Sequence, residues 1–422
     1  MTSIIYGVNF AVGVIFTIMY TYQMFYLAVG FVDKHRKQKK YIAKTEHKIA
    51  VLISARNESA VIGELCKSIL KQDYPKEKLH TFVVADNCTD NTAEICRDLG
   101  ATVFERFNKK LVGKGYALNF AFEKIFANPA YDYEAFIILD ADNLLESNYV
   151  REMNATFDQG YRAATSYRNS KNYAQNWISS GYSLWFLREA EYLNRPRQVL
   201  HTSCAISGTG FLVATDLIKE RGGWHYHLLT EDIEFSAATV LTGECIGYAK
   251  DAVFYDEQPV TFKQSWNQRL RWAKGFYQVL GKHGVDLMKK ALRFEKTSFG
   301  AYDMLMNLTP ALLLMITSLV FNVLVLLYIL LTGGDAELLK ACATAIAYSL
   351  GYYYCTFCFI GTVTTITEWK KILASTWMKI RTVFTFPLFM FTYMPIAVTA
   401  LFKKIEWTPI EHTVVKSIDD MK

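Results

Sequence analysis

The 422-residue chain has few cysteines and little net charge. Small disulfide-stapled domains are short and rich in cysteine, a class that a long chain with 8 cysteines does not fit. Disordered chains are poor in aromatic residues, whereas 15% of these residues are Phe, Trp or Tyr. A net charge of +6 is too small to indicate a nucleic-acid partner. The length instead predicts two or three domains with buried cores.

Charged residues are also absent from three long apolar runs, at residues 4–32, 308–331 and 341–367. Each run is longer than the roughly 20 residues that a helix needs to cross a bilayer. The mean hydropathy of the whole chain is only +0.09, because a charged middle segment lies between the runs. The sequence therefore predicts a membrane protein with a charged domain outside the bilayer.

The first apolar run differs from a signal peptide. No basic residue precedes it, it is too long, and no small-residue cleavage pattern closes it. We therefore expect residues 1–33 to remain as a transmembrane helix. The basic cluster DKHRKQKK at residues 33–40 then lies in the cytoplasm by the positive-inside rule. This predicts a multi-pass plasma-membrane protein whose middle part, about residues 41–300, is cytoplasmic.

A fourth apolar stretch, residues 382–402, has basic residues on both sides, at 370–371 and 403–404. Both flanks thus favour the cytoplasm. Pro387 and Pro395 are expected to break its helical continuity. We expect a bent re-entrant or interfacial segment that returns the chain to the cytoplasmic side.

The charged middle has the pattern of an α/β domain, which we place at residues 34–258. Apolar runs rich in β-branched residues alternate with helical stretches: strands at 47–54, 79–85, 101–105 and 136–139, helices at 58–71, 92–99 and 116–126. Such alternation is typical of βαβ units and a mostly parallel sheet. Ligands of these sheets bind beyond the carboxyl ends of the strands.

Polar residues follow these strands where the fold predicts a site. Asp140 and Asp142 close the strand at 136–139, and residues i and i+2 of an extended chain point to one face. Both carboxylates can therefore approach one Mg²⁺ or Mn²⁺, a cation that takes one or two carboxylates together with substrate phosphates. The alternative is a pair of solvated acids at the end of a strand.

Two further motifs suit a nucleotide. Asp86 ends the second strand and can hydrogen-bond a base or ribose; alternatively it begins an Asx-turn before a helix that Asn91 or Thr92 caps. Lys114, between two glycines, precedes a helix, where backbone amides and an ammonium can meet phosphate. An ordinary glycine turn is the alternative for this second motif.

Two motifs suit an acceptor. Asp232 follows Thr230 and Glu231 at the start of a helical stretch and can act as a general base toward a hydroxyl. Alternatively, acidic residues in the first turn of a helix only interact favourably with the helix dipole. The segment SGTGF, which contains Gly208 and Thr209, would let the backbone approach an acceptor closely, although a tight turn explains it equally.

The segment QRLRW places Gln268, Arg271 and Trp272 on one face of a helix, with Arg269 pointing away. An indole beside an amide and a guanidinium suits a sugar ring next to a diphosphate. The surrounding residues, 259–300, are basic and aromatic, which also favours amphipathic helices lying on anionic lipid.

Taken in order, DNCTD, LDAD, SGTGF, TED and QRLRW resemble the membrane-bound processive glycosyltransferases of family two: cellulose, chitin and hyaluronan synthases and their bacterial relatives. The resemblance covers about residues 50–280, and the flanking membrane helices fit it. It implies a GT-A fold and an inverting enzyme that polymerises UDP-glucose or UDP-N-acetylglucosamine into an extracellular β-glycan and assists its export.

The resemblance also implies roles for the matching residues and their neighbours at the strand ends. The donor nucleotide would contact Ala55, Arg56, Glu58, Asp86, Lys114 and Asp140. The metal would be held by Asp140 and Asp142. Catalysis would use Asp232 as base, with Glu231 and Thr230 beside it. The acceptor and diphosphate would contact Gln268, Arg271, Trp272, Gly208 and Thr209. Trp407 and His412 loosely match a C-terminal gating motif.

Residues 301–422 are then a transmembrane and re-entrant region with fewer helices than the best-known synthases carry. One possibility is that the product leaves through a channel completed by the interfacial helices or by a second subunit, which would be another copy or an accessory export protein. The other possibility is that the product is short. A non-processive membrane transferase that adds single sugars to a lipid or cell-wall acceptor is the second hypothesis. A non-catalytic scaffold is the third, and the intact acidic set argues against it.

Overall fold

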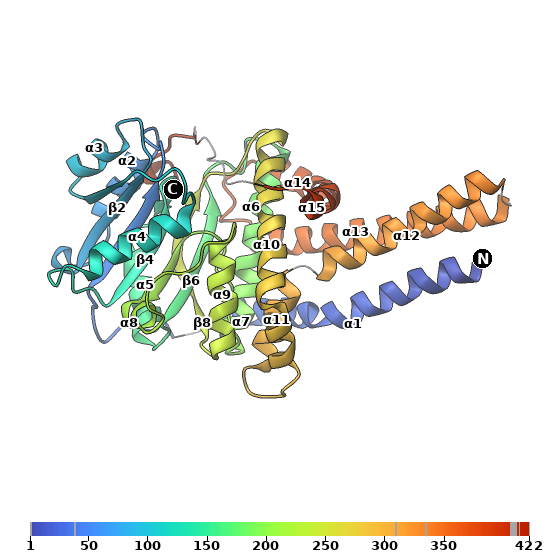
Figure 1. The fold of residues 1–422 in the computed structure, drawn as a ribbon, viewed down its shortest axis with the longest axis horizontal. Coiled ribbons are helices and arrows are strands. Elements are labelled where there is room, and N and C mark those ends of the chain that lie inside the picture. Colours follow the sequence, from blue (N-terminus) through green and yellow to red (C-terminus); the bar gives the residue numbers. More distant parts are fainter. Residues whose placement is uncertain are drawn as a thin grey trace.

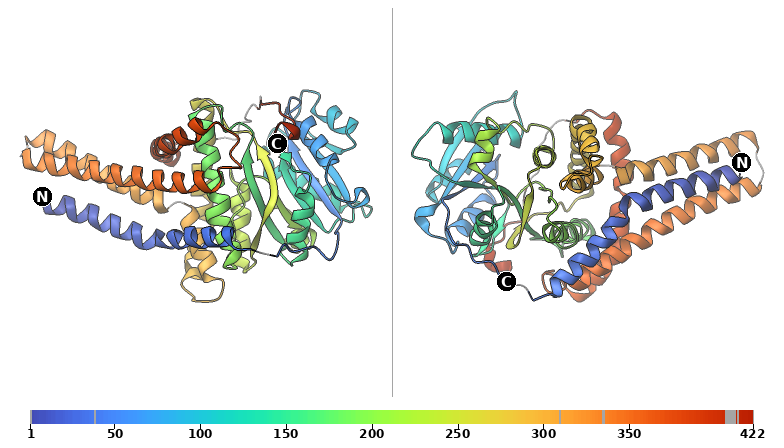
Figure 2. Two further views of the ribbon diagram at one scale, coloured as in Figure 1. Left: turned by 180° about the vertical axis from the view of Figure 1, so that it is seen from behind. Right: turned by 90° about the horizontal axis from the view of Figure 1, so that it is seen from below.

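The chain is described by a computed structural model that covers residues 2–37, 39–308, 310–333, 336–405, 412 and 414–421. An α/β domain forms one end of the molecule, and a bundle of long helices projects from it (Figure 1). The N-terminus lies at the far end of the bundle, whereas the C-terminus lies on the α/β domain (Figures 1 and 2).

The α/β domain contains an eight-stranded sheet with the order β3-β2-β1-β4-β7-β6-β8-β5. Its strands are β1 (Ile49–Ala55), β2 (Leu79–Asp86), β3 (Thr102–Arg106), β4 (Ala135–Asp140), β5 (Leu144–Leu145), β6 (Ala163–Ser170), β7 (Phe211–Ala214) and β8 (Ile246–Asp256). Strands β3, β2, β1 and β4 are parallel neighbours, and β6 pairs in parallel with β8. The mostly parallel sheet predicted from the sequence is confirmed.

Helices cover both faces of this sheet (Figure 1). In chain order they are α2 (Ile62–Leu70), α3 (Thr92–Asp98), α4 (Lys114–Phe126), α5 (Tyr149–Asp158), α6 (Trp177–Glu189), α7 (Arg195–Val199), α8 (Thr215–Glu220) and α9 (Glu231–Thr242), with a π-helical turn, η2 (Ala190–Asn194), between α6 and α7 and short 3₁₀ turns at η1 (Lys76–Lys78) and η3 (Ile418–Met421). Alternate side chains of the buried strands pack into two core clusters, one on each face. The predicted strands and helices between residues 47 and 140 all form, most of them within a few residues of their expected limits.

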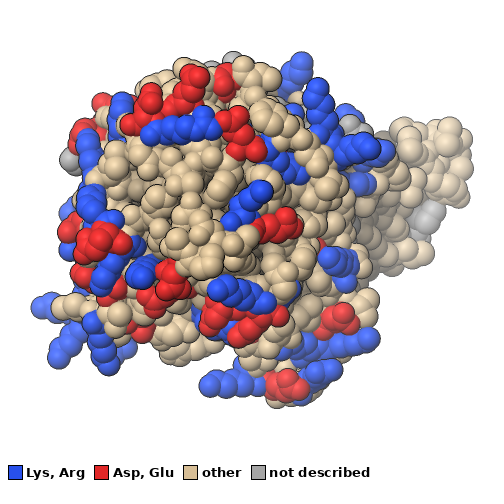
Figure 3. Space-filling model, turned by 60° about the vertical axis from the view of Figure 1, so that its left-hand side comes forward, with Lys and Arg blue, Asp and Glu red and all other residues tan. Residues whose placement is uncertain are grey.

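Three long helices form the projecting bundle: α1 (Thr2–His35), α12 (Pro310–Thr332) and α13 (Ala336–Thr367). Asn9 of α1 and Asn322 of α12 hydrogen-bond each other through their side chains at 2.7 and 3.0 Å. Acidic and basic residues spread over the α/β domain in Figure 3, while the visible part of the bundle is almost free of them. These helices coincide with the three charge-free runs of the sequence.

By length and composition, two stretches among the described residues can cross a membrane: Thr2–His35 and Thr376–Phe402. The apolar helix Ile316–Thr332 is shorter. Membrane association of the chain follows from these helices together with the projecting apolar bundle.

The fourth apolar stretch forms α14 (Thr376–Phe391) and α15 (Tyr393–Phe402), which are separated only by Thr392. The predicted interruption is confirmed in part: the helix is broken at Thr392, three residues before Pro395, whereas Pro387 lies inside α14. Pro395 lies in the first turn of α15, where its missing N–H costs little. Pro387 leaves the carbonyl of Val383 without its helical donor, and the thiol of Cys358 on α13 lies 3.6 Å from that oxygen instead.

This stretch runs in a different direction from the projecting bundle. Figure 1 views α14 and α15 nearly end-on, whereas α1, α12 and α13 run across the page. Helices α10 (Phe262–Ala291) and α11 (Ser298–Leu308) also run across the bundle direction, and α10 packs against α15. The chain then returns to the α/β domain, where Met421 is buried in a core cluster. The C-terminus therefore lies on the same side as this domain.

Candidate active site

The carboxyl ends of β1, β2 and β4 meet at the edge of a cavity of about 600 Å³. The cavity is lined by nearly all of the residues selected from the sequence: Ala55, Arg56, Glu58, Asp86, Lys114, Asp140, Asp142, Gly208, Thr230, Glu231, Asp232, Gln268, Arg271, Trp272 and His412. Trp407 lies outside the described residues. Motifs that are dispersed over more than 350 positions of the sequence thus share one cavity.

The two carboxylates of the LDAD motif differ in their surroundings. The side chain of Asp140 is 39% exposed, and its Oδ1 accepts a hydrogen bond from Lys114 Nζ at 2.5 Å. Asp142 is buried and accepts from the backbone N–H of Glu257 at 2.8 Å. Burial alone would raise the pKa of Asp142, but the charges of His412 and Lys171 and this N–H hold the pKa below its usual value.

These two carboxylates fit a divalent cation. No cluster of three or more His, Cys, Asp or Glu able to hold a metal occurs in the described part of the chain. Asp140 and Asp142 both line the cavity, so they would supply two oxygen ligands and leave the remaining positions to substrate oxygens and water. This is the ligand set that Mg²⁺ and Mn²⁺ take with phosphorylated substrates.

Lys114 begins α4 immediately after Gly113, whose φ of 134° is accessible mainly to glycine. Its ammonium reaches across the cavity edge to Asp140 and to the carbonyl oxygen of Gly208 at 2.7 Å. On the other side of Lys114, a Cβ at Gly115 would overlap the carbonyl oxygen of Tyr226. Both glycines therefore fix where the ammonium lies, as a phosphate-binding role for Lys114 requires.

Asp232 lies in the first turn of α9, and its carboxylate is held by Gly208 of the SGTGF segment. Its Oδ2 accepts a hydrogen bond from the backbone N–H of Gly208 at 2.5 Å. Burial raises the pKa of Asp232 above its usual value. Burial, and then the charge of Asp232, raise the pKa of the neighbouring Glu231 to about 8. A carboxylate with a raised pKa is the kind of group that general-base catalysis uses.

Thr209 does not reach the cavity. Its side chain is buried, donates to Asn143 Oδ1 at 2.6 Å and accepts from the backbone N–H of Asp140 at 2.8 Å. The expectation that Thr209 contacts the acceptor is therefore not met by its position. Thr209 instead holds the turn that carries Asp140 and Asp142.

Asp86 depends on a partner that the sequence did not reveal. Its Oδ1 pairs with Arg106 Nη1 at 2.6 Å, and both side chains are only 7% exposed. Burial raises the pKa of Asp86, although Arg106 opposes the shift. The next helix is capped by neither Asn91 nor Thr92, because Asp90 accepts from the backbone N–H of Thr92 at 3.1 Å.

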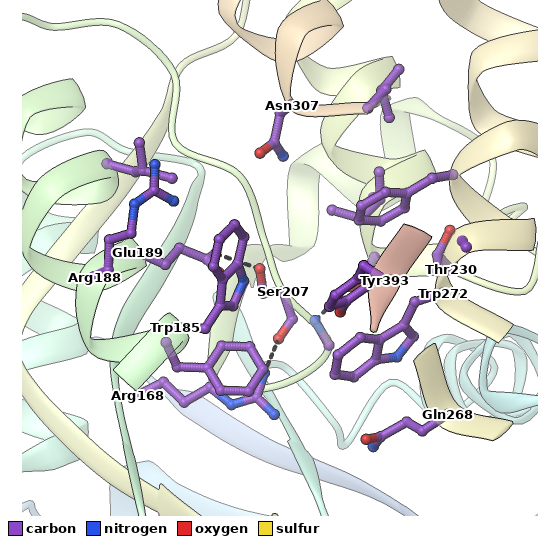
Figure 4. A pocket seen from close by; sticks show the side chains of 18 of the residues that line it. Arg168, Trp185, Arg188, Glu189, Ser207, Thr230, Gln268, Trp272, Asn307 and Tyr393 are labelled. Carbon is purple, nitrogen blue, oxygen red and sulfur yellow. Dashed lines mark hydrogen bonds between the residues drawn. The ribbon is translucent and has the colours of Figure 1, made fainter. Parts of the chain in front are cut away.

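The QRLRW motif lies on α10 as the spacing predicted. Gln268, Arg271 and Trp272 line the cavity, whereas Arg269 is fully buried on the other face, with its guanidinium 4.5 Å from the centre of the Phe389 ring. In Figure 4, Trp272 and Gln268 lie on one wall of the cavity, with Thr230 above them in that view.

The opposite wall contains residues that the motifs did not predict. Arg168 on β6 donates to Asp256 Oδ2 at 2.7 Å and to the carbonyl oxygen of Ser207 at 3.0 Å. Glu189 is half-buried, accepts a hydrogen bond from the hydroxyl of Ser207, and has a pKa raised by desolvation. Their sequence neighbourhoods carry no short motif, so only the tertiary fold identifies them.

The family model described as glycosyltransferase like family 2 matches residues 47–275, more than half of the chain. The chain belongs to glycosyltransferase family 2. It is therefore an enzyme that transfers sugars, and the resemblance drawn from the motifs is confirmed at the level of the family.

Curated relatives of this family-2 glycosyltransferase differ in their products. The chain is 26% identical over 291 residues to the probable glycosyltransferase YdaM of Bacillus subtilis, which covers 64% of this chain and 66% of that protein. It is 26% identical to the beta-monoglucosyldiacylglycerol synthase of Nostoc (66% and 59% covered) and to the poly-beta-1,6-N-acetyl-D-glucosamine synthase of Staphylococcus epidermidis (59% and 60%). The matched part spans less than two thirds of each of these relatives.

One solved structure matches nearly the whole family-2 chain. The mannosyltransferase PcManGT of Pyrobaculum calidifontis, solved with GDP-Man and Mn²⁺, has a TM-score of 0.60 and 17% sequence identity. The match covers 94% of this chain and 99% of that one. The GT-A fold is thus confirmed.

Proposed function

We propose that this glycosyltransferase polymerises the sugar of UDP-glucose or UDP-N-acetylglucosamine into an extracellular β-glycan. The observation that supports the proposal is the lining of the cavity. Besides Asp140 and Asp232 it includes Trp272 of α10, Phe357 of α13 and Tyr393 of α15, which pack against one hydrophobic cluster. The flat faces of such aromatic side chains suit the apolar faces of sugar rings, so a growing chain could bind along them.

In the proposed reaction, the acceptor hydroxyl attacks the anomeric carbon while Asp232 takes its proton. The new bond to the acceptor oxygen forms as the bond to the diphosphate oxygen breaks, and UDP leaves with that electron pair. Attack opposite the leaving group inverts the anomeric centre and gives a β linkage. The Gly208 N–H keeps the Asp232 carboxylate aimed at the cavity, which is the orientation that general-base catalysis needs.

The other residues bind and orient the donor and acceptor. Asp86, Ala55, Arg56 and Glu58 would hold the nucleotide at the strand ends, while Lys114 and Arg271 would contact the diphosphate. A bound Mg²⁺ or Mn²⁺ at Asp140 and Asp142 would stabilise negative charge on the leaving diphosphate. Gln268 would bind an acceptor hydroxyl, because its buried Oε1 has no hydrogen-bond partner among the described residues.

The proposed topology has α1, α12 and α13 crossing the plasma membrane, with α10, α14 and α15 at its cytoplasmic surface. The catalytic domain and the C-terminus are then cytoplasmic, and the basic cluster after α1 stays on the same side. Lipid bilayer, donor and growing glycan are the partners this implies. A second copy or an accessory export subunit would complete the channel around so small a bundle.

Single-sugar transfer to a lipid or cell-wall acceptor is the second candidate. It is favoured by the apolar residues Phe16, Leu27 and Ile360, which line the cavity where it meets the bundle. A lipid acceptor could enter along this wall. Curated relatives at the same 26% identity include both a polymer synthase and a glycolipid synthase by name.

The test is to incubate the full chain in nanodiscs with a panel of UDP-sugars, to measure UDP release, and to size the product. The proposal expects release with UDP-glucose or UDP-N-acetylglucosamine and a product of many sugars. A product with one added sugar per acceptor would favour the second candidate. No UDP release with any common UDP-sugar would contradict both.

A further inference from the structure

A buried arginine on the wall of the cavity forms no ion pair within the described part of the chain, although the charge of the neighbouring Glu189 acts on it. Arg188 on α6 is 9% exposed, and its Nη2 donates to Gln23 Oε1 of α1 at 2.8 Å. Its guanidinium lies 4.9 Å from the centre of the Trp185 ring. Burial lowers the pKa of Arg188 to about 10, so the group still carries its charge at neutral pH. A buried charge of this kind is costly unless an anion accompanies it.

The other buried arginines are compensated. Three pair with carboxylates: Arg106 with Asp86, Arg195 with Glu191 and Arg197 with Asp303. Arg269 is covered by aromatic rings and donates to the carbonyl oxygen of Phe389 at 3.2 Å, away from the cavity. Arg188 differs because it lines the cavity, where a ligand can supply the missing negative charge.

Two amides line the cavity near the junction of α1, α6 and α11, and Gln23 is the one in contact with Arg188. Gln23 and Asn307 both line the cavity, and the side chain of Asn307 has no hydrogen-bond partner within the described residues. Tyr20 of α1 donates to the carbonyl oxygen of Met306 at 3.0 Å, which fixes α1 against α11 at this level. Figure 4 shows Arg188 and Trp185 on the wall opposite Trp272, with Asn307 above them in the view. A guanidinium with a neighbouring amide matches the oxygens of a phosphate.

Beyond these polar groups the same wall becomes apolar. Phe16 and Leu27 of α1 line the cavity together with Tyr353 and Ile360 of α13, and the rings of Phe16 and Tyr353 lie edge to face at 5.7 Å. A ligand that satisfies both parts has an anionic head at Arg188 and a hydrocarbon chain along this wall of α1 and α13. Phospholipids are the anionic amphiphiles available at a membrane surface.

We propose that Arg188 and Gln23 bind the phosphate of a lipid whose chain lies along the cavity wall formed by α1 and α13. The lipid occupies the Trp185 wall, opposite the Trp272 wall proposed to bind the glycan. The site goes beyond the proposed sugar transfer, and direct binding tests it whether or not the chain makes a polymer.

The experiment compares phosphatidic acid with diacylglycerol of the same acyl chains, since the two differ only in the phosphate. Binding to the full-length chain in an uncharged detergent is measured by native mass spectrometry. We expect the wild-type chain to bind phosphatidic acid at least tenfold more tightly than diacylglycerol. Arg188→Gln should remove this preference, Arg188→Lys should restore part of it, and Arg97→Gln on the exposed face of α3 should leave it unchanged.

Several results would overturn the site. The first is equal binding of both lipids, and the second is an unchanged preference in Arg188→Gln. The third is displacement of phosphatidic acid by inorganic phosphate at concentrations similar to those of the lipid, because the acyl chains would then contribute nothing to binding. UDP binding by each variant reports whether it is folded. If Arg188→Gln does not fold, Tyr353→Trp provides the second test, because a larger ring fills the apolar cleft and should weaken phosphatidic acid binding while Arg188 is intact.

Discussion

Nδ1 of His412 lies 2.9 Å from Oε2 of Glu58, although 354 residues separate the two in the sequence. Burial would lower the pKa of His412, but Asp142 and Glu58 raise it to about 10. The imidazole is therefore positively charged at neutral pH, beside one of the two carboxylates of the LDAD motif. The C-terminal segment thus places a cation at the cavity, next to the residues proposed to bind the donor.

Replacing His412 should release this segment from the α/β domain. In His412→Ala, Glu58 loses its cationic partner, so we expect the bond after Lys416 to be cleaved several-fold faster by a lysine-specific protease at pH 7. The control is Asp419→Asn, which removes an ion pair with Lys71 whose side chains are both 57% exposed. Exposed pairs contribute about 0–1 kcal/mol, so cleavage should change little. Equal cleavage of wild type and His412→Ala would contradict a holding role for His412.

Replacing Asp232 by Asn should abolish transfer and leave donor binding intact. The amide keeps the size of the side chain but cannot accept the acceptor proton, and general bases typically contribute about 10²- to 10⁴-fold to rate. UDP release measures transfer, and calorimetric titration with UDP measures binding. Asp216→Asn, an exposed position on α8, serves as the control. Polymer formation by Asp232→Asn would show that another group is the base.

The strands and the main motifs could be predicted from the sequence because their signals are local. The run at 136–139 is apolar and ends in Asp140, and a parallel sheet brings such strand ends together wherever they occur. The periodicity of α10 likewise separated Trp272 from Arg269 correctly. In each case a few neighbouring residues determine the direction of the side chain.

The remaining features depend on contacts between distant segments. Arg106 neutralises Asp86 only because β3 pairs with β2, and Arg188 reaches Gln23 only because α1 packs on η2 and α7, which follow α6. The carbonyl that Pro387 leaves without its helical donor is likewise contacted by a thiol from α13. The spacing of residues within one segment cannot predict contacts of this kind with a distant segment.

The pKa of Glu231, about 8, predicts a change in activity on the alkaline side. The carboxyl is protonated below that pH and ionised above it, because the folded environment raises its pKa. Ionisation adds a second negative charge beside Asp232 and opposes the negative charge that develops on the leaving diphosphate. We expect the wild-type rate of UDP release at saturating donor to fall between pH 7 and 9.

Glu231→Gln cannot ionise, so its pH profile should lack this fall, whatever its absolute rate. The two profiles are compared at constant ionic strength. A fall of the same size in the Gln variant would assign the alkaline transition to another group.

Asp86 and Arg106 should contribute to the free energy of unfolding as a pair. Removing Arg106 leaves a buried carboxylate without its cation, and breaking a buried pair typically costs about 3–5 kcal/mol. We therefore expect Arg106→Met to unfold at a clearly lower temperature than wild type in thermal scans. The double variant with Asp86→Asn should regain part of the loss, since the unpaired charge is gone. If the double variant is less stable than Arg106→Met, the two side chains do not compensate each other.

A substitution at Gly115 tests whether the start of α4 must lie as close to the loop before α9 as it does. A Cβ at this position would overlap the carbonyl oxygen of Tyr226, a backbone atom that cannot rotate away. Gly115→Ala should therefore cost about 1–3 kcal/mol of unfolding free energy, as overpacking does, and displace the neighbouring Lys114. Calorimetric titration with UDP should then show weaker binding, because Lys114 would no longer meet the diphosphate. Gly63→Ala on α2 is the matched control, since its Cβ would meet only Ile95 at 3.5 Å and alanine favours a helix. Equal stability and UDP affinity in both variants would show that α4 tolerates the added methyl group and that its position does not govern the phosphate site.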